Sequence, residues 1–229
     1  MPYSRFLFFI LLFCQSQVII VAQKNLSIDF KFKYRQQELV KDKWYVGNNQ
    51  DSIRFETLKF YISDLKVYFK DSKKFLEQNS FHLLDFENSE SMLILLKNIP
   101  NDNISHISFD LGIDSTTNVS GALGGDLDPT KGMYWTWQNG YINFKLEGRS
   151  TLCKTRNNEF QFHIGGYLYP FNTLQKIVLN IPNIDSYIVV FDLESFMKEI
   201  DLTILTHVMS PQLEAVEISR KIATAFSIE

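Results

Sequence analysis

The chain is poor in the residues that build disulfide-bonded, metal-clustered and most catalytic proteins. Its 229 residues include two cysteines, Cys14 and Cys153, and four histidines. Because Cys14 falls in an N-terminal stretch that we expect to be removed, no internal disulfide is expected, and Cys153 is interpreted as a small buried apolar residue. The sequence also lacks HExxH, CxxC, GxSxG, Walker and dinucleotide-binding motifs. We therefore expect a protein that is not an enzyme.

Charge of one sign and long apolar runs are missing as well. The net charge is −3 and there is no long run of basic residues, so nucleic-acid binding is not expected. Beyond residue 22 no apolar stretch reaches the ~20 residues that a membrane-spanning helix needs. We expect no transmembrane segment in the mature chain.

The N-terminus is the exception. Arg5 precedes an apolar run at 6–13, and a second apolar run at 18–21 leads to Ala22. This order predicts a secretory signal peptide over residues 1–22, which places the mature protein in the periplasm or cell envelope. Phe13 stands where a small residue precedes a lipidated cysteine, so a lipid anchor at Cys14 is not expected.

Aromatic residues and short alternating patterns are abundant. The chain contains 20 Phe and 10 Tyr, residue types that favour strands. The alternation changes phase at Ser63-Asp64, which indicates a bulge or tight bend. We predict an all-β fold, an antiparallel β-sandwich, as one domain over residues 23–229. Alternating apolar and polar residues predict its strands at 26–32, 58–62, 65–69, 81–86, 107–113, 142–146, 160–164, 177–181 and 188–191.

The C-terminal part has a different pattern. Residues 193–200 predict a short helix, and Ser210 followed by Pro211 is typical of a helix start. The C-terminal helix that follows is expected to carry four apolar residues on one face, Leu213, Val216, Ile222 and Phe226.

Two of the three tryptophans lie in the segment GGDLDPTKGMYWTWQNG, residues 124–140. Asn139-Gly140 predicts a hairpin with a two-residue type I′ turn. From this pattern both tryptophans are expected in the core, because cross-strand aromatic pairs stabilise a sheet face. The predicted turn pairs Trp137 with Ile142, Trp135 with Phe144 and Met133 with Leu146.

The irregular loop before this hairpin collects carboxylates and glycines. Calcium takes six to eight oxygen ligands, and glycine lets backbone carbonyls converge on the ion. Asp114, Asp126 and Asp128 are therefore candidate calcium ligands, although no EF-hand spacing is present. Asp and Gly are also common turn residues, so a purely structural loop is the other interpretation.

Two of the histidines, His163 and His207, are candidate metal ligands. His163 is expected on the strand face opposite Phe160 and Ile164. His207 and Met209 place an imidazole and a thioether two residues apart, ligand types that suit copper. A lone strand histidine also serves as a hydrogen-bonded structural residue, and that interpretation stays beside the metal one.

Several stretches together resemble the MbnP-like family of exported bacterial β proteins. They are LKFYISDLKVYF, FHLLDF, FDLGIDSTTNVSGALGGDLDPTKGMYWTWQNGYINFKLEG and FQFHIGGY, within a resemblance that extends over about residues 26–228. The family is named for a periplasmic member associated with the copper chelator methanobactin. The resemblance implies copper binding through histidine together with a tryptophan oxidised to kynurenine. A di-haem partner enzyme of the peroxidase type carries out that oxidation.

By this resemblance, copper in this chain is bound by His163 and by Trp135 or Trp137, with His207 as a further candidate. Many relatives also carry a histidine in the first strand, where this chain has Lys31-Phe32-Lys33. The function implied is metal handling by an exported protein. The alternative is a metal-free or calcium-stabilised β-sandwich that binds a component of the cell envelope.

Overall fold

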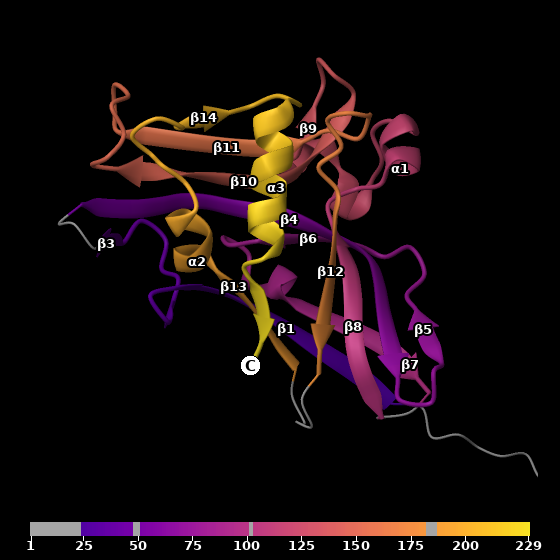
Figure 1. The fold of residues 1–229 in the computed structure, drawn as a ribbon. Helices are drawn as coiled ribbons and strands as arrows, with labels where there is room; N and C mark the ends of the chain where they lie inside the picture. Colours follow the sequence, from indigo (N-terminus) through magenta and orange to yellow (C-terminus); the bar gives the residue numbers. More distant parts are fainter. Residues whose placement is uncertain (1–23, 48–50, 101–102, 182–186) are drawn as a thin grey trace, which may run out of the picture.

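The computed structural model of the chain describes residues 24–47, 51–100, 103–181 and 187–229. Within these ranges the strands form two sheets that enclose a common core (Figure 1). The predicted β-sandwich is confirmed. The predicted signal peptide lies outside the described residues. None of the described helices has the length and apolar character needed to span a bilayer.

The smaller sheet has five strands in the described residues, in the order β15-β13-β1-β2, with β7 paired to β1. Strand β1 pairs in parallel with β13, from Ile28 opposite Tyr187 to Lys33 opposite Asp192, so this sheet is not purely antiparallel as predicted. The strands are β1 (Lys24–Tyr34), β2 (Gln37–Glu38), β7 (Leu93–Ile99), β13 (Tyr187–Asp192) and β15 (Phe226–Ile228).

The larger sheet has ten strands in the described residues, with the central order β12-β8-β4-β10-β11-β14. The strands in that order are β12 (Gln175–Asn180), β8 (Ile104–Leu111), β4 (Ser52–Phe69), β10 (Gly140–Ser150), β11 (Glu159–Gly165) and β14 (His207–Val208). Four short strands pair at the side of these, β3 (Trp44–Val46), β5 (Lys74–Leu76), β6 (Phe81–Asp85) and β9 (Tyr134–Trp135).

Strand β4 runs through both alternating segments that the sequence separates. Asp64 has a left-handed φ of 51°, and the pairing with β8 shifts register between Ser63 and Lys66. This irregularity confirms the predicted change of phase. Because of it, Leu58, Phe60 and Ile62 face the same core as the apolar residues of the strand's second half.

Short helices connect and cover the strands. The predicted helix at 193–200 is confirmed as α2 (Leu193–Lys198), and a further short helix, α1 (Ser115–Val119), follows β8. The C-terminal helix α3 (Leu213–Ala223) contacts β11 and β12 (Figure 1). Three single-turn 3-10 helices complete the described elements, η1 (Ser89–Met92), η2 (Gly125–Leu127) and η3 (Pro129–Lys131).

The predicted apolar face of the C-terminal helix is partly wrong. Val216 and Ile222 are buried, whereas Leu213 at the first turn is 60% exposed. Phe226 lies beyond the helix, in β15, where it pairs with Phe191 and its ring packs 4.9 Å from that ring. Strand pairing and the aromatic core therefore take Phe226 out of the helix.

Aromatic side chains from both sheets fill the core between them. The ring of Phe32 in β1 lies 5.3 Å from Phe60 in β4, and Phe30 meets Phe109 in β8 at 6.0 Å. Cys153 belongs to this core and is 1% exposed, and burial raises the pKa of its thiol. Its interpretation as a buried apolar residue is confirmed.

A second, smaller cluster lies on the other face of the larger sheet. Tyr61 follows the core residue Phe60 in β4 and points the opposite way, into this cluster. The outer cluster consists of Tyr61, Leu83, Ile113, Leu127, Met133, Trp135, Tyr141 and Ile142. The tryptophan segment therefore belongs to the outer face of the sandwich rather than to its centre.

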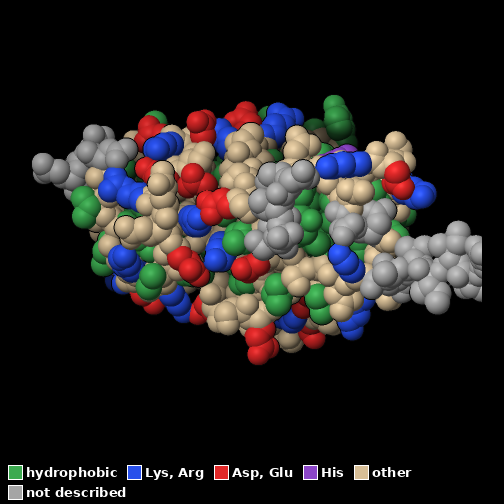
Figure 2. All heavy atoms as spheres, turned by 90° about the horizontal axis from the view of Figure 1, so that it is seen from below, with side chains coloured by type: hydrophobic (Ala, Val, Ile, Leu, Met, Phe, Trp, Pro, Cys, Tyr) green, Lys and Arg blue, Asp and Glu red, His purple; other side chains and the backbone are tan. Residues whose placement is uncertain are grey.

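Acidic and basic side chains are interspersed on the molecular face that Figure 2 shows, and hydrophobic side chains are scattered between them. No field of one sign gathers on this face over the described residues. A mixed surface of this kind is what the small net charge of −3 predicts.

Candidate functional site

The hairpin that carries the tryptophans has a wider loop than the sequence predicts. Strand β9 pairs with β10 through Trp135 opposite Gly140 and Tyr134 opposite Tyr141. The predicted pairs of Trp135 with Phe144, Trp137 with Ile142 and Met133 with Leu146 are therefore wrong; the Met133 carbonyl accepts from the Ile142 N–H instead. Four residues, 136–139, connect the strands, and the Gln138 N–H donates to the Trp135 carbonyl at 3.4 Å.

A bulge in β10 decides which residues share a face. The pairing of β10 with β11 shifts between Ile142 and Phe144, so Ile142 joins the outer cluster while Phe144 faces the main core. The intervening Asn143 is buried, and its Oδ1 accepts from the Ile113 N–H at 2.9 Å. Its Nδ2 donates to the Thr173 hydroxyl at 2.9 Å. Asn143 thus holds the bulge through two buried hydrogen bonds.

The two tryptophans lie in different environments. Trp135 is 7% exposed and belongs to the outer cluster, whereas Trp137 in the loop is 65% exposed. The two rings are nevertheless in contact, with centroids 5.7 Å apart. The expectation that both tryptophans are core residues is thus confirmed for Trp135 and wrong for Trp137.

Trp135 reaches across β10 to β11. A Cβ on Gly165 would lie 2.7 Å from the Trp135 Cζ3 and 2.7 Å from the Tyr141 carbonyl oxygen. Only glycine leaves room for this ring, so Gly165 is the seat of Trp135 on β11. His163 lies two residues before Gly165, on the same face of the strand.

His163 is held by a carboxylate on the neighbouring strand. Its Nε2 lies 2.7 Å from the Glu147 Oε1, and the histidine is 7% exposed. His163 itself pairs with Lys145 in the register of β10 and β11, and the Lys145 Nζ lies 3.6 Å from the same Glu147 oxygen. The predicted position of His163, on the face opposite Phe160 and Ile164, is confirmed.

The contact between His163 and Glu147 affects the pKa of the carboxylate and the position of the histidine proton. The hydrogen bond from His163 is the largest cause that lowers the pKa of Glu147 to about 2; Lys145 contributes and burial opposes. A carboxylate at this pKa accepts the hydrogen bond, so the proton of neutral His163 sits on Nε2. The Nδ1 lone pair then remains, and among the described residues this nitrogen has no hydrogen-bond partner.

Comparison with known proteins identifies the family of the chain. A family model described as MbnP matches residues 23–210. The chain belongs to the MbnP family. Among solved structures it is similar to MbnP from Methylosinus trichosporium, with 14% identity, a TM-score of 0.61, and coverage of 86% of this chain and 88% of that chain. At this identity the likeness shows the fold alone. No curated protein matches the chain.

The other copper candidates of this MbnP family member lie around His163. His207 in β14 is opposite Gln161 in the parallel pairing with β11, so it lies on the same face as His163. Strand spacing puts the Cα atoms of the two histidines roughly 8 Å apart. His207 is exposed, with its Nδ1 3.0 Å from the Thr206 hydroxyl, and Met209 after it is 43% exposed.

The first strand contributes nothing to this face. Phe32 points into the core and packs on Phe60, while Lys33 forms an ion pair with Glu229. In the ranges that the structure describes, no three His, Cys, Asp or Glu side chains gather so that they could hold a metal ion. A copper site here therefore needs a ligand of another type beside His163.

The three candidate calcium ligands each have separate partners. Asp114 caps α1, accepting from the Thr117 N–H at 2.9 Å, and Asp128 caps η3, accepting from the Thr130 N–H at 2.8 Å. Asp126 accepts from the Leu83 N–H at 3.1 Å and also pairs with Lys131. Burial acts to raise the pKa of Asp114, but the Thr117 hydrogen bonds outweigh it and the pKa is lowered. Asp114 and Asp128 thus serve as helix caps, whereas Asp126 connects its loop to β6.

Proposed function

We propose that this MbnP family member binds copper at the outer face of β10 and β11 and serves in metal handling as an exported protein. The observation that carries the proposal is the Glu147–His163 pair. Histidines that ligate metals usually donate their second ring N–H to a carboxylate or carbonyl, which fixes the tautomer and the ring orientation. His163 has this arrangement, with Nε2 on Glu147 at 2.7 Å and Nδ1 left for a metal.

In this proposal, the copper ligand that is needed beside His163 comes from the tryptophan pair, Trp135 and Trp137. Trp135 is seated on Gly165 beside His163, and Trp137 contacts it from the loop. Because Trp137 is 65% exposed and Trp135 is 7% exposed, a partner enzyme has direct access only to Trp137. We propose that Trp137 is the residue oxidised to kynurenine and that Trp135 is its packed support. Imidazole and a kynurenine oxygen or nitrogen then form the donor set, with His207 within reach of the same face.

The residues present suit copper better than calcium. An imidazole nitrogen is a ligand type that copper prefers, whereas calcium takes carboxylate and carbonyl oxygens. The chain's own contribution is to hold the His163 ring through Glu147 and to present the tryptophan pair beside it. The di-haem peroxidase-like partner belongs to this proposal, because the oxidation needs an external oxidising enzyme.

The test is a Cu(I) competition titration against a chromophoric chelator, with protein purified from its native host. His163→Ala and Trp137→Phe are expected to weaken binding at least tenfold, and Glu147→Gln by about 10-fold to 100-fold. The matched control is His82→Ala, because His82 forms a similar pair with Glu77 at 2.8 Å on another strand. Indistinguishable curves for all proteins, or no binding by any, would refute the copper site.

Peptide mass spectrometry of the same material tests the modification separately. We expect the mass change of kynurenine on the peptide that carries Trp137, and an unmodified Trp135. Kynurenine at Trp135, or unmodified tryptophan at both positions, would contradict the proposed division of roles. Protein made in a host without the partner enzyme is the control, and it should carry no kynurenine.

A further inference from the structure

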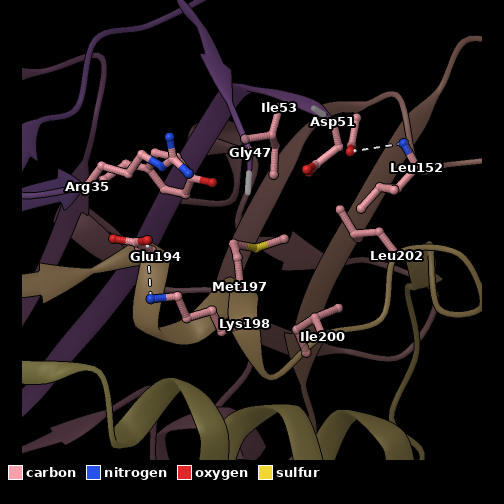
Figure 3. Close-up of a pocket in the computed structure, with 12 residues that line it drawn as sticks. Arg35, Gly47, Asp51, Ile53, Leu152, Glu194, Met197, Lys198, Ile200 and Leu202 are labelled. Carbon is pink, nitrogen blue, oxygen red and sulfur yellow. Dashed lines mark hydrogen bonds and ion pairs between the residues drawn. The ribbon is translucent and has the colours of Figure 1, made fainter. Parts of the chain in front are cut away.

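The charged side chains of the pocket in Figure 3 already have partners. The pocket opens beside helix α2, where Glu194 and Lys198 form an ion pair at 3.2 Å. Arg35 and Asp51 line the same opening, and each has an interaction partner. Within the described residues, this pocket therefore has no unpaired charged group for a ligand, in contrast to one edge of the smaller sheet, where backbone groups are unpaired.

That edge is strand β7. Strand β1 pairs with β13 on one side and with β7 on the other, since Ile28 is opposite both Tyr187 and Ile94. Strand β7 has no second neighbouring strand among the described residues (Figure 1). It is therefore an outer strand of the smaller sheet, and its seven residues make it longer than the two-residue β2 on the same side of β1.

The pairing of β1 shows which backbone groups of β7 face outwards. The Phe32 carbonyl accepts from the Leu39 N–H at 2.8 Å, so it points away from β13. Backbone groups alternate in direction along a strand, so the residue of β1 opposite Ile94 also points this way and bonds to Ile94. Leu93 and Leu95 consequently direct their N–H and carbonyl groups to the open edge, where no described residue bonds to them.

The side chains at this edge are apolar and exposed. Leu93 is 54% exposed and Leu95 is 46% exposed, while Ile94 and Leu96 beside them are buried. Edge strands are normally protected by charges, proline or a bulge. In β7 the first charged residue is Lys97, after a run of four apolar residues. An open apolar edge of this length favours pairing with another strand.

The other long edge strand, β12, is better protected. It is the outer strand of the larger sheet, and it also contacts β15 of the smaller sheet. Its exposed Val178 is flanked on the same face by Lys176 and Asn180, which are exposed as well. The combination of an open edge and exposed leucines is thus particular to β7 among these two strands.

A second copy of the chain fits this edge. Two copies of one strand pair antiparallel about a two-fold axis, which closes the assembly at two chains. With Leu95 opposite Leu95 of the second copy, the outward-facing backbone groups meet as hydrogen-bonded pairs. Ile94 then lies opposite Leu96 on the buried face, and Leu93 lies opposite Lys97 on the exposed face. Both faces of the smaller sheet therefore continue across the dimer.

This register also suits the charges near the edge. Lys97 lies opposite Leu93 rather than opposite a second lysine, so like charges do not meet. Glu90 is exposed in η1, just before β7, and in the described part of the chain neither Lys97 nor Glu90 has an ion-pair partner. The Lys97 ammonium group of each chain approaches the strand end that leads to Glu90 of the second copy. The charges therefore favour this pairing.

We propose that two copies of this chain associate through antiparallel pairing of their β7 strands, centred on Leu95. A strand pair of this length buries less surface than a standard protein interface, so the dimer is weak and its population rises with protein concentration. The outer face of β10 and β11 belongs to the larger sheet, so the proposed copper site is not part of this interface.

Sedimentation velocity of the mature chain, over a concentration series up to about 1 mM, tests the dimer. The sedimentation coefficient is expected to rise from the monomer value toward the dimer value. Leu95→Lys is expected to fold normally and to weaken dimerisation at least tenfold, because it sets two ammonium groups opposite each other. The matched control is Val178→Lys on β12, which should associate like the natural chain. A monomer at every concentration, or equal association of Leu95→Lys, would overturn the proposal.

Cysteine cross-linking tests the register. In a hydrogen-bonded antiparallel pair the Cα atoms lie about 5.5 Å apart, which suits a disulfide. Leu95→Cys is therefore expected to give a covalent dimer when diamide takes up two electrons and two protons from the two thiols. Cys153 is 1% exposed and should not react.

Leu93→Cys is the matched control for this experiment. Its exposure is similar, but its two copies lie roughly 14 Å apart in the proposed register, beyond the reach of a disulfide. We expect it to remain monomeric under the same conditions. Cross-linking of Leu93→Cys as efficient as that of Leu95→Cys, or no cross-linking of Leu95→Cys, would overturn the proposed pairing.

Discussion

Replacing each tryptophan of the hairpin by alanine should have very different effects on stability. Trp135 is 7% exposed and packs within the outer cluster and on Gly165. Trp135→Ala is expected to lower the free energy of unfolding by about 3–5 kcal/mol, because it leaves a large cavity that its neighbours fill only in part. Trp137 is 65% exposed, and Trp137→Ala is expected to cost about 1 kcal/mol or less, chiefly through the lost ring contact.

Urea unfolding followed by far-ultraviolet circular dichroism measures both changes without relying on tryptophan fluorescence. For a chain of this size the Trp135→Ala difference corresponds to a drop in melting temperature of roughly 6–20 °C. The measurements use protein free of copper, so that metal binding does not add to the stability of the folded state. Equal destabilisation by the two substitutions, or a larger effect at Trp137, would refute the division into a packed and an exposed ring.

Three further predictions concern the carboxylates and the bulge. The pKa of Glu147 is about 2 against an ordinary 4.5, so its stabilisation is complete above about pH 4.5 and is lost as the pH falls toward 2. Urea unfolding across this window should show a loss of up to about 3 kcal/mol that Glu147→Gln abolishes, and an unchanged acid profile in that variant would contradict the assignment. Asn143→Ala should cost about 2–4 kcal/mol in the same assay because it leaves buried partners unpaired, and a cost under about 1 kcal/mol would count against that role. Since Asp114 and Asp128 already cap short helices and Asp126 already contacts the Leu83 N–H and Lys131, EDTA should leave the melting temperature unchanged, and a rise with added calcium would revive the calcium interpretation.

The sequence predicts the strands well where one pattern dominates. In β4 the alternation of apolar and polar residues locates the strand, and its change of phase at Ser63-Asp64 locates the irregularity. Both predictions hold because the apolar residues of the alternation are the ones that the fold buries. The tryptophan hairpin shows the opposite case. Asn139-Gly140 predicts a two-residue turn, but Asn139 alone adopts a left-handed φ of 51° and closes a four-residue loop. The bulge at Asn143 depends on partners in two distant segments, and local pattern does not contain that information.

The candidate site, like the strands, can be predicted from the sequence only in part. The face that His163 occupies follows from its position between Phe162 and Ile164, and the structure confirms it. The sequence pattern alone does not identify its partner Glu147, although the alternation of β10 places Glu147 on the outer face. Recognising the pair needs the register between β10 and β11, which sets Glu147 opposite Gln161. The parallel pairing of β1 with β13 is likewise hidden, because it joins residues at opposite ends of the chain.

That parallel pairing has a consequence for the order in which the chain can fold. Strand β1 is the first described strand, and its partner β13 begins at Tyr187. During synthesis from the N-terminus, the edge of β1 that pairs with β13 therefore stays unpaired until almost all of the domain has been made. Pairing over so long a separation is slow, since the loop entropy is lost before the contacts form. A truncation that removes β13 and β15 should leave β1 as an exposed apolar edge and make the truncated domain aggregate.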